Sequence, residues 1–265
     1  MRDDEAGGKS SEAEMSGTGR SYAGERIAKV LARAGVCSRR DAERLIADGR
    51  VAIDGTVLTS PALNVTDKNV ITVDGKPLRA AEETRVWRYH KPPGTITTAK
   101  DPQGRTTVFD KLPRSMPRVV SVGRLDYNTE GLLLLTNDGE LARYLELPQN
   151  SWPRHYRVRV HGHADSQKLA AVANGVTISG VRYEPVKIEF VRGREEGGDR
   201  WLTVTIHEGK NREVRNIMAY LGFQVRRLIR MEYGPFKLGK LARGDVEEIP
   251  QRVLRRSLQH YFDEM

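Results

Sequence analysis

Apolar residues near the start of the chain recur with the spacing of two consecutive helices. In the first pattern they fall at positions i, i+3, i+4 and i+7 of one helical face, at Ile27, Val30, Leu31 and Ala34. Gly35 follows as a stop signal, and Ser38 is placed to cap a second helix that ends at Gly49. The apolar face of this second helix comprises Ala42, Leu45 and Ile46. The spacing therefore predicts two short amphipathic helices.

Short alternating segments follow these helices and lead into turn signals. Val51 and Ile53 alternate into Asp54-Gly55, and residues 70–73 lead into a second Asp-Gly pair at 74–75. Asp-Gly between apolar segments is a strong signal for a tight hairpin. We therefore expect residues 24–79 to form one compact domain of two helices and a few short strands. Residues 1–23 carry almost no bulky apolar side chains, which predicts a disordered tail.

From residue 85 onward strand-like segments dominate, with helical patterns between them. The strand-like runs are 85–89, 119–122, 132–135, 156–160, 186–191 and 202–206, and the helical patterns are 140–145, 167–172, 213–221 and 253–262. Residues 80–84 have the character of a linker, and residues 90–94 that of a rigid turn. Because the elements do not alternate as regular βαβ units, the fold class is predicted to be α+β. A small N-terminal helical/β domain would precede a mainly antiparallel-sheet domain at 85–250 and a C-terminal helix at 251–265.

Composition narrows the function to the binding of an anionic partner. The 265 residues contain 44 Lys and Arg against 35 Asp and Glu, a formal net charge of +9, and nucleic acid is the commonest partner for such an excess. Apolar runs such as Leu132 to Leu135 are far shorter than the roughly 20 residues of a bilayer helix. No secretory signal is visible, so we expect a cytoplasmic protein. The single Cys37 excludes an internal disulfide, and the His residues lack metal-ligand spacing, so no metal is expected.

Basic residues are concentrated in the predicted N-terminal domain, with eight of them between Arg20 and Asp54 against five acidic residues. The order helix, Ser-Arg-Arg-x-Ala-Glu-x-Leu-Ile, Gly-x-Val-x-Ile-Asp-Gly resembles the small RNA-binding domain first seen in small-subunit ribosomal protein four. This resemblance implies RNA-backbone contacts, which give affinity without sequence reading, from Lys29, Ser38, Arg39, Arg40, Arg44 and Arg50. A solvated helix surface of mixed charge is the alternative interpretation of these residues.

The most informative run is residues 123–139, Gly-Arg-Leu-Asp-Tyr-Asn-Thr-Glu-Gly-Leu-Leu-Leu-Leu-Thr-Asn-Asp-Gly. Its aspartate stands in a Gly-bounded loop that leads directly into an apolar strand, so a rigid element would hold the carboxylate. An isolated aspartate in a loop is more often a turn or cap residue. The whole run, however, resembles the defining motif of the pseudouridine synthases, and the resemblance implies that Asp126 is the catalytic aspartate.

Other segments are similar to further parts of this family, in the same order along the chain. Residues 91–94, Lys-Pro-Pro-Gly, resemble a segment that braces the catalytic loop, with His90 where Asn is frequent. Residues 101–113 are similar to a segment of the branch that modifies ribosomal RNA. Residues 154–158 resemble the basic-x-Tyr motif, and residues 208–215, Glu-Gly-Lys-Asn-Arg-Glu-Val-Arg, resemble the third motif. The last resemblance implies that Arg215 pairs with the catalytic aspartate and that Val214 packs the floor of the site.

The implied reaction breaks the bond from ribose C1′ to base N1, rotates the base and rejoins it through C5, without a cofactor. It requires a carboxylate that stays ionised in a dry pocket, and the permanently charged guanidinium of Arg215 suits that task. Whether Asp126 attacks C6 of the base or C1′ of the sugar stays open. Tyr156 is implied to stack on the flipped uracil and to remove the C5 proton. Arg124 is implied to fill the vacated position or to hold a flanking phosphate.

The segment from His207 to Arg256 forms a second basic region, with twelve Lys and Arg against six acidic residues. Within it Lys210 and Arg212 are expected to line an RNA-binding cleft. The resulting hypothesis is a monomeric enzyme that isomerises a uridine in 23S ribosomal RNA, free or in a pre-ribosomal particle, with no metal, cofactor or membrane. Two alternatives are a 16S ribosomal RNA enzyme of the same architecture and a non-catalytic RNA-binding assembly factor.

Overall fold

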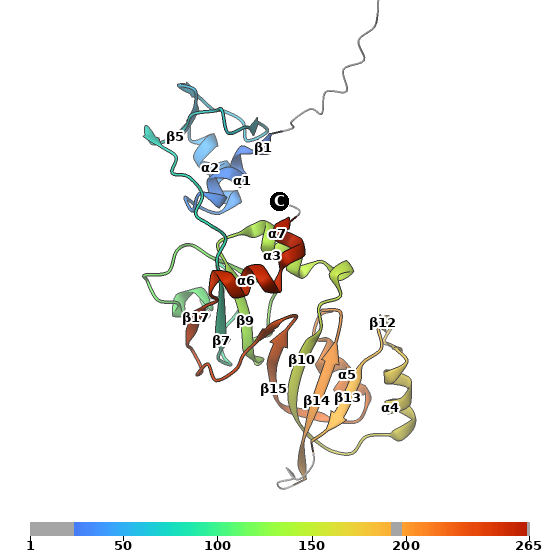
Figure 1. Cartoon of the computed structure of the whole chain (residues 1–265). Coiled ribbons are helices and arrows are strands. Elements are labelled where there is room, and N and C mark those ends of the chain that lie inside the picture. The colour runs from blue at the N-terminus through green and yellow to red at the C-terminus, as the bar shows by residue number, and fades with distance from the viewer. Residues whose placement is uncertain (1–23, 192–197, 264–265) are drawn as a thin grey trace, which may run out of the picture. The chain divides into compact units, whose positions relative to one another are not determined.

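The computed structural model describes residues 24–191 and 198–263, and the chain divides into two compact units (Figure 1). The described part of the first unit comprises residues 24–31 and 38–78, and the second unit comprises residues 32–37 and the chain from residue 79 onward. The division near residue 78 lies close to the boundary expected from the sequence. The tail expected at residues 1–23 lies outside the described residues.

Both helices expected near the start of the chain are present, as α1 (Ile27–Arg33) and α2 (Arg39–Ala47). Helix α1 buries Ile27, Ala28 and Leu31, and helix α2 buries Ala42 and Ile46. Ser38 caps α2 as its sequence position predicts, because its hydroxyl accepts a hydrogen bond from the Asp41 backbone N–H at 3.1 Å. The two amphipathic faces thus supply the apolar core of the first unit.

Short antiparallel strands complete the first unit. Strands β1 (Glu25–Arg26) and β4 (Asn64–Val65) pair with each other. A four-stranded sheet has the order β3 (Thr56–Val57), β2 (Val51–Ile53), β5 (Ile71–Val73), β6 (Lys76–Pro77). Both expected Asp-Gly turns join neighbouring strands of this sheet, β2 to β3 and β5 to β6.

A nine-stranded sheet organises the second unit. Its main order is β13-β14-β10-β15-β9-β7-β17, with β8 paired to β9 and β16 paired to β15. The strands are β7 (Val86–Lys91), β8 (Val120–Val122), β9 (Glu130–Thr136), β10 (Arg154–His161), β13 (Lys187–Phe190), β14 (Asp199–Ile206), β15 (Gln224–Tyr233), β16 (Phe236–Lys237) and β17 (Val246–Glu248). Among the described strands of this sheet only β15 and β9 run parallel, so the mainly antiparallel sheet is confirmed.

Helices cover both faces of this sheet and enclose two apolar clusters. The helices are α3 (Gly139–Glu146), α4 (Ser166–Ala173), α5 (Glu213–Tyr220), α6 (Gln251–Ser257) and α7 (Gln259–Asp263), and β11 (Val176–Ile178) pairs with β12 (Val181–Tyr183) as a separate hairpin. Leu133 and Leu135 of β9 belong to the cluster that includes residues of α4 and α5. Leu132 and Leu134 belong to the cluster under α3, α6 and α7, which lie together in Figure 1. Burial on both faces explains the unbroken Leu run of β9.

Three local predictions were wrong. Strand β7 continues through His90 and Lys91, where a turn was expected, and the turn starts only at Pro92. The ten-residue strand β15 was missed, because its mixed exposure pattern and many charges hide the alternation. The C-terminal segment is not one helix but two, α6 and α7, separated at Leu258.

Gly131 allows β9 to approach β15 closely, so a side chain at this position is expected to destabilise the sheet. Its φ is +104°, and a Cβ at this position would lie 2.2 Å from the Arg230 carbonyl oxygen. We expect Gly131→Ala to lower the free energy of unfolding by roughly 2–4 kcal/mol, measured by urea denaturation. Gly139→Ala, at the start of α3 with open space around it, is the matched control. Equal denaturation midpoints for the two variants would contradict the expected clash.

Candidate active site

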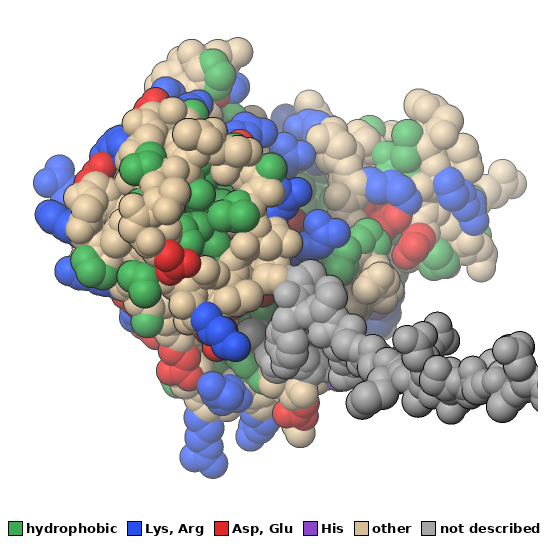
Figure 2. Space-filling model, turned by 90° about the horizontal axis from the view of Figure 1, so that it is seen from above, with side chains coloured by type: hydrophobic (Ala, Val, Ile, Leu, Met, Phe, Trp, Pro, Cys, Tyr) green, Lys and Arg blue, Asp and Glu red, His purple; other side chains and the backbone are tan. Residues whose placement is uncertain are grey.

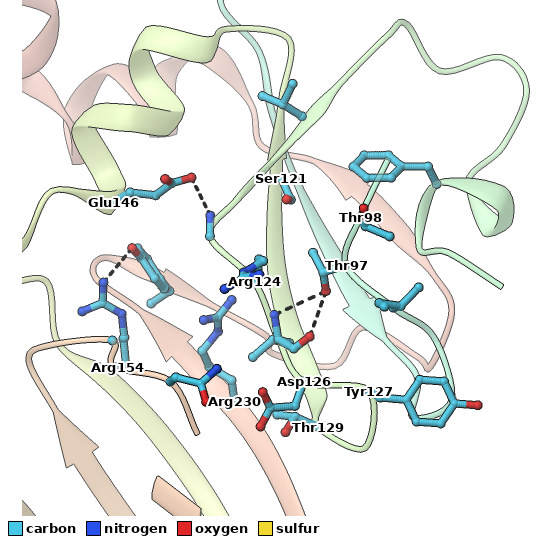
Figure 3. A pocket seen from close by; sticks show the side chains of 18 of the residues that line it. Thr97, Thr98, Ser121, Arg124, Asp126, Tyr127, Thr129, Glu146, Arg154 and Arg230 are labelled. Carbon is cyan, nitrogen blue, oxygen red and sulfur yellow. Dashed lines mark hydrogen bonds between the residues drawn. The ribbon is translucent and has the colours of Figure 1, made fainter. Parts of the chain in front are cut away.

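A cavity of about 1670 Å³ lies in the second unit, between the segment that follows β8 and the loop that precedes α5 (Figure 3). Its walls include strands β10 and β15 and much of residues 96–121. The sequence-predicted residues of the catalytic domain all line it, namely Arg124, Asp126, Tyr156, Lys210, Arg212, Val214 and Arg215. The fold therefore brings together three motifs that are separated by up to about 90 residues in the chain.

Two guanidinium groups flank the Asp126 carboxylate. The Asp126 Oδ2 atom lies 3.6 Å from Arg215 Nε and 3.6 Å from Arg212 Nη1. The implied Asp126–Arg215 pairing is therefore present as a contact, whereas Arg212 was assigned to RNA binding alone. Burial lowers the pKa of Arg215, as does the charge of Arg212, while Asp126 raises it. The Asp126 carboxylate therefore lies between two cations at the wall of the cavity.

Lys91 anchors the loop that carries Asp126. Its side chain is fully buried, and Nζ donates to the carbonyl oxygens of Asp126 at 3.1 Å, Thr129 at 3.0 Å and Pro92 at 3.1 Å. Burial lowers the pKa of Lys91 to about 8, although the charges of Asp126 and Glu130 oppose this shift. Below that pH an ammonium group ties both ends of the loop to the end of β7, which is the bracing role that the Lys-Pro-Pro-Gly segment implies.

Three more side chains fix the same loop from other directions. The Thr97 hydroxyl donates to the Leu125 carbonyl at 3.0 Å and accepts from its N–H at 3.3 Å. The Glu146 carboxylate accepts a hydrogen bond from Gly123 N–H at 2.7 Å, as Figure 3 shows. Arg215 Nη2 donates to the Asn128 carbonyl at 2.9 Å. Thr97 and Glu146 were missed from the sequence, because no local pattern marks either one.

A second loop, residues 207–212, presents Arg212 to Asp126 and is held by two buried carboxyl groups. Arg212 adopts a left-handed conformation, φ 50°, at the start of α5. Glu213 accepts a hydrogen bond from Lys210 N–H at 2.9 Å, and Glu208 pairs with the Lys210 ammonium group. Burial and the neighbouring Glu208 carboxylate raise the pKa of Glu213 to about 7. These contacts engage Lys210, which was expected to face RNA.

Tyr156 lies on β10 at the wall of the cavity and is 7% exposed. Its neighbours across the sheet are Val204 on β14 and Arg230 on β15. Arg154, the basic residue of the same motif, donates to the carbonyls of Trp152 and His207 and to the Tyr233 hydroxyl. Arg154 is thus used in packing, whereas Tyr156 borders the cavity that also contains Asp126.

The residues assigned to RNA in the first unit differ in their surroundings. Arg39 and Arg40 are exposed on α2, but the Ser38 hydroxyl is occupied as the helix cap. Three of the others form ion pairs with acidic neighbours, namely Lys29 with Glu25, Arg44 with Asp41 and Arg50 with Asp74. Exposed pairs of this kind contribute little stability, so a phosphate can replace the carboxylate at small cost. Figure 2 shows Lys and Arg side chains distributed widely over the visible face of the molecule.

Within residues 24–191 and 198–263, no cluster of His, Cys, Asp and Glu side chains is suited to hold a metal ion. The helices of these same residues include none that is long and apolar enough to cross a membrane.

The raised pKa of Glu213 makes a specific contribution to the pH dependence of stability. Between pH 4.5 and about 7 the folded protein retains a proton at Glu213 that the unfolded chain has lost. The contribution to stability is therefore complete below pH 4.5 and falls by up to about 3 kcal/mol as the pH rises to 7. We expect Glu213→Gln to remove this decline. The measurement is the unfolding free energy of the variant and of wild type, each determined at pH 4.5 and at pH 7.5. Glu43→Gln, an exposed change on α2, should leave it intact, and a decline of the wild-type size in Glu213→Gln would refute the assignment.

The geometry defines a class of protein in which a carboxylate is held between cations in a basic cavity, with a separate small helical/β unit. Residues 85–220 match the family model described as RNA pseudouridylate synthase, and residues 25–71 match the S4 domain. The chain belongs to the RNA pseudouridine synthase family, and it is therefore an isomerase with an S4-type RNA-binding domain. Both parts of the resemblance expected from the sequence are confirmed.

Relatives of known sequence and structure extend over most of the chain. An uncharacterized RNA pseudouridine synthase of Rickettsia typhi is 46% identical over 242 residues, which are 90% of this chain and 98% of the relative. A Haemophilus influenzae protein named ribosomal large subunit pseudouridine synthase B is 45% identical over 85% of this chain and 65% of its own length. A crystal structure of a pseudouridylate synthase matches 88% of this chain and all of its own, at 25% identity and a TM-score of 0.61.

Proposed function

We propose that this enzyme isomerises a uridine of 23S ribosomal RNA to pseudouridine, with Asp126 as the catalytic carboxylate. The observation that carries the catalytic assignment is the position of Asp126 Oδ2, 3.6 Å from two guanidinium nitrogens inside a cavity that is large enough for a nucleotide. The choice of the large-subunit RNA is supported by relatives with about 45% identity that are named large subunit pseudouridine synthase B.

The surrounding residues supply the remaining requirements of the reaction. A uridine must leave its stack to reach Asp126, and an aromatic wall offsets part of that cost. Tyr156 provides this wall and is also our candidate for removing the C5 proton after the base has rotated. Exposed Arg124, two residues before Asp126, is suited to occupy the vacated position or to hold a flanking phosphate. Arg215 and Arg212 lie beside the carboxylate, and Arg212, whose side chain is 53% exposed, can contact RNA as well.

The first unit is proposed to bind the RNA backbone. Its basic residues offer charge that can exchange carboxylates for phosphates, namely the half-buried Lys29 and the exposed Arg39, Arg40, Arg44 and Arg50. Lys210 adds to this set near the cavity. Ser38 would take part only through its backbone, because its hydroxyl caps α2. All the proposed catalytic residues come from one chain, which supports action as a monomer, and the ribosomal RNA substrate supports a cytoplasmic location.

Replacement of the carboxylate tests the catalytic assignment directly. We expect Asp126→Asn to reduce tritium release from C5-tritiated uridine in ribosomal RNA to below about 1% of wild type. RNA affinity should stay within about twofold, because the change removes no cation. Asp245→Asn, at an exposed position of the same unit, serves as the matched control and should retain full activity. Residual turnover of Asp126→Asn above one per cent would rule out the nucleophile.

The choice of RNA can be tested with transcripts and with cells. Purified enzyme is expected to form pseudouridine in 23S RNA and not in 16S RNA, and a deletion strain should lose the same 23S modification. Chemical mapping of pseudouridine in both RNAs gives the readout. Modification of 16S RNA alone would establish the small-subunit enzyme, and RNA binding without any modification would establish an assembly factor.

A further inference from the structure

Arg230 is a buried cation at the cavity wall with no role in the reaction as proposed above. Its side chain is 3% exposed, and among the described residues no ion pair joins it to a carboxylate. Nε donates to the Leu132 carbonyl at 2.8 Å, but Nη2 is buried without a hydrogen-bond partner. Burial of an unpaired guanidinium is costly, so its retention requires compensation from elsewhere.

The surroundings of Arg230 place this charge next to the reacting groups. Arg230 on β15 is the cross-strand neighbour of Tyr156 on β10, and both residues line the cavity that holds Asp126. In the view of Figure 3, Arg230 lies between Arg154 and the segment that carries Asp126. The Arg230 guanidinium carbon lies 5.0 Å from the Tyr233 ring centre, which restricts the side chain from one side.

Arg154 provides an internal comparison for Arg230. It is also buried, at 8% exposure, and its guanidinium carbon lies 4.7 Å from the ring of Tyr233. Its terminal nitrogens, however, have protein acceptors, namely two carbonyls and the Tyr233 hydroxyl. Packing alone therefore accounts for Arg154, whereas Arg230 keeps an unused donor.

We infer that Arg230 donates a hydrogen bond to a carbonyl oxygen of the flipped uracil and stabilises the base while it is detached from the sugar. On the C1′ route, the Asp126 carboxylate bonds to C1′ as the C1′–N1 bond breaks, and the bonding electron pair leaves with the base as an anion whose charge is spread over N1, O2 and O4. Arg230 stabilises that anion without giving up a proton. C5 of the rotated base then bonds to C1′ and displaces the Asp126 carboxylate, after which the C5 proton is removed and N1 is protonated. This inference rests on the proposed function and adds a second catalytic cation to it.

Depth in the cavity favours the base over a phosphate as the partner of Arg230. Arg212 is 53% exposed at its side chain and Arg124 is also exposed, so these two cations can meet the RNA backbone at the surface. Arg230, by contrast, is almost fully buried beside Tyr156 at the wall of the cavity, away from the surface where Arg212 and Arg124 are exposed. A uracil in this position offers two carbonyl acceptors and no backbone charge.

Single-turnover kinetics of Arg230→Gln tests the inference. At saturating RNA we expect the isomerisation rate to fall about 100-fold, with the dissociation constant of the RNA changed less than twofold. Arg255→Gln, at an exposed side chain of α6, is the matched control and should react at the wild-type rate. If Arg230→Gln fails to fold, as judged by circular dichroism, Arg230→Lys replaces it and should show an intermediate loss.

Sulfur substitution of the target uridine identifies the atom that Arg230 contacts. We expect 2-thiouridine or 4-thiouridine to slow the wild-type enzyme about tenfold and to slow the Arg230 variant much less, because the affected hydrogen bond is already absent. A rate for the Arg230 variant within threefold of wild type, while Asp126→Asn is inactive, would overturn this inference and leave the proposed function standing. The inference would also be overturned if neither thio base affected wild type and the Arg230 variant differently, while a phosphorothioate in the RNA backbone did. An active Asp126→Asn would instead refute the proposed function.

Discussion

The buried ammonium group of Lys91 is the interaction on which the rest of the site depends. The Lys91 Nζ atom donates hydrogen bonds to the carbonyl oxygens of Asp126, Thr129 and Pro92, each at about 3 Å. A neutral residue in this position would leave several buried acceptors unsatisfied, at a cost of about 1–3 kcal/mol each. The loop therefore presents the Asp126 side chain from a braced backbone, since the carbonyls of Asp126 and Thr129 both bind the Lys91 ammonium group.

The basic residues around the cavity have different structural roles. The excess of +9 suggested an RNA partner, but the structure divides the cations near the cavity into different tasks. Lys91 orders backbone, Arg212 and Arg215 flank one carboxylate, and Arg154 packs against Tyr233. Net charge describes affinity for RNA as a whole, whereas the individual contacts determine where chemistry occurs.

Sequence patterns predicted those features that depend on neighbours along the chain. The Ser38 cap, both Asp-Gly turns and the motif around Asp126 are local, and each is found where it was expected. Features that need distant partners were missed. Thr97 gains its role only by lying against Leu125, and the charge-rich β15 becomes a central strand only between β10 and β9. Arg212 was assigned to RNA because no local pattern shows that it shares Asp126 with Arg215.

The central sheet of the second unit positions the cavity residues that come from distant parts of the chain. Strand β9 is buried on both faces, so the Asp126 loop at its start is fixed to the two apolar clusters together. Gly131 lets β15 approach that strand closely, which brings Arg230 to the same level as the end of the loop. Antiparallel pairing of β15 with β10 then sets Tyr156 beside Arg230. Placement of the Tyr156 ring, a carboxylate and a buried cation around one cavity thus follows from strand register, and a slip of one residue would turn the strand side chains to the opposite face.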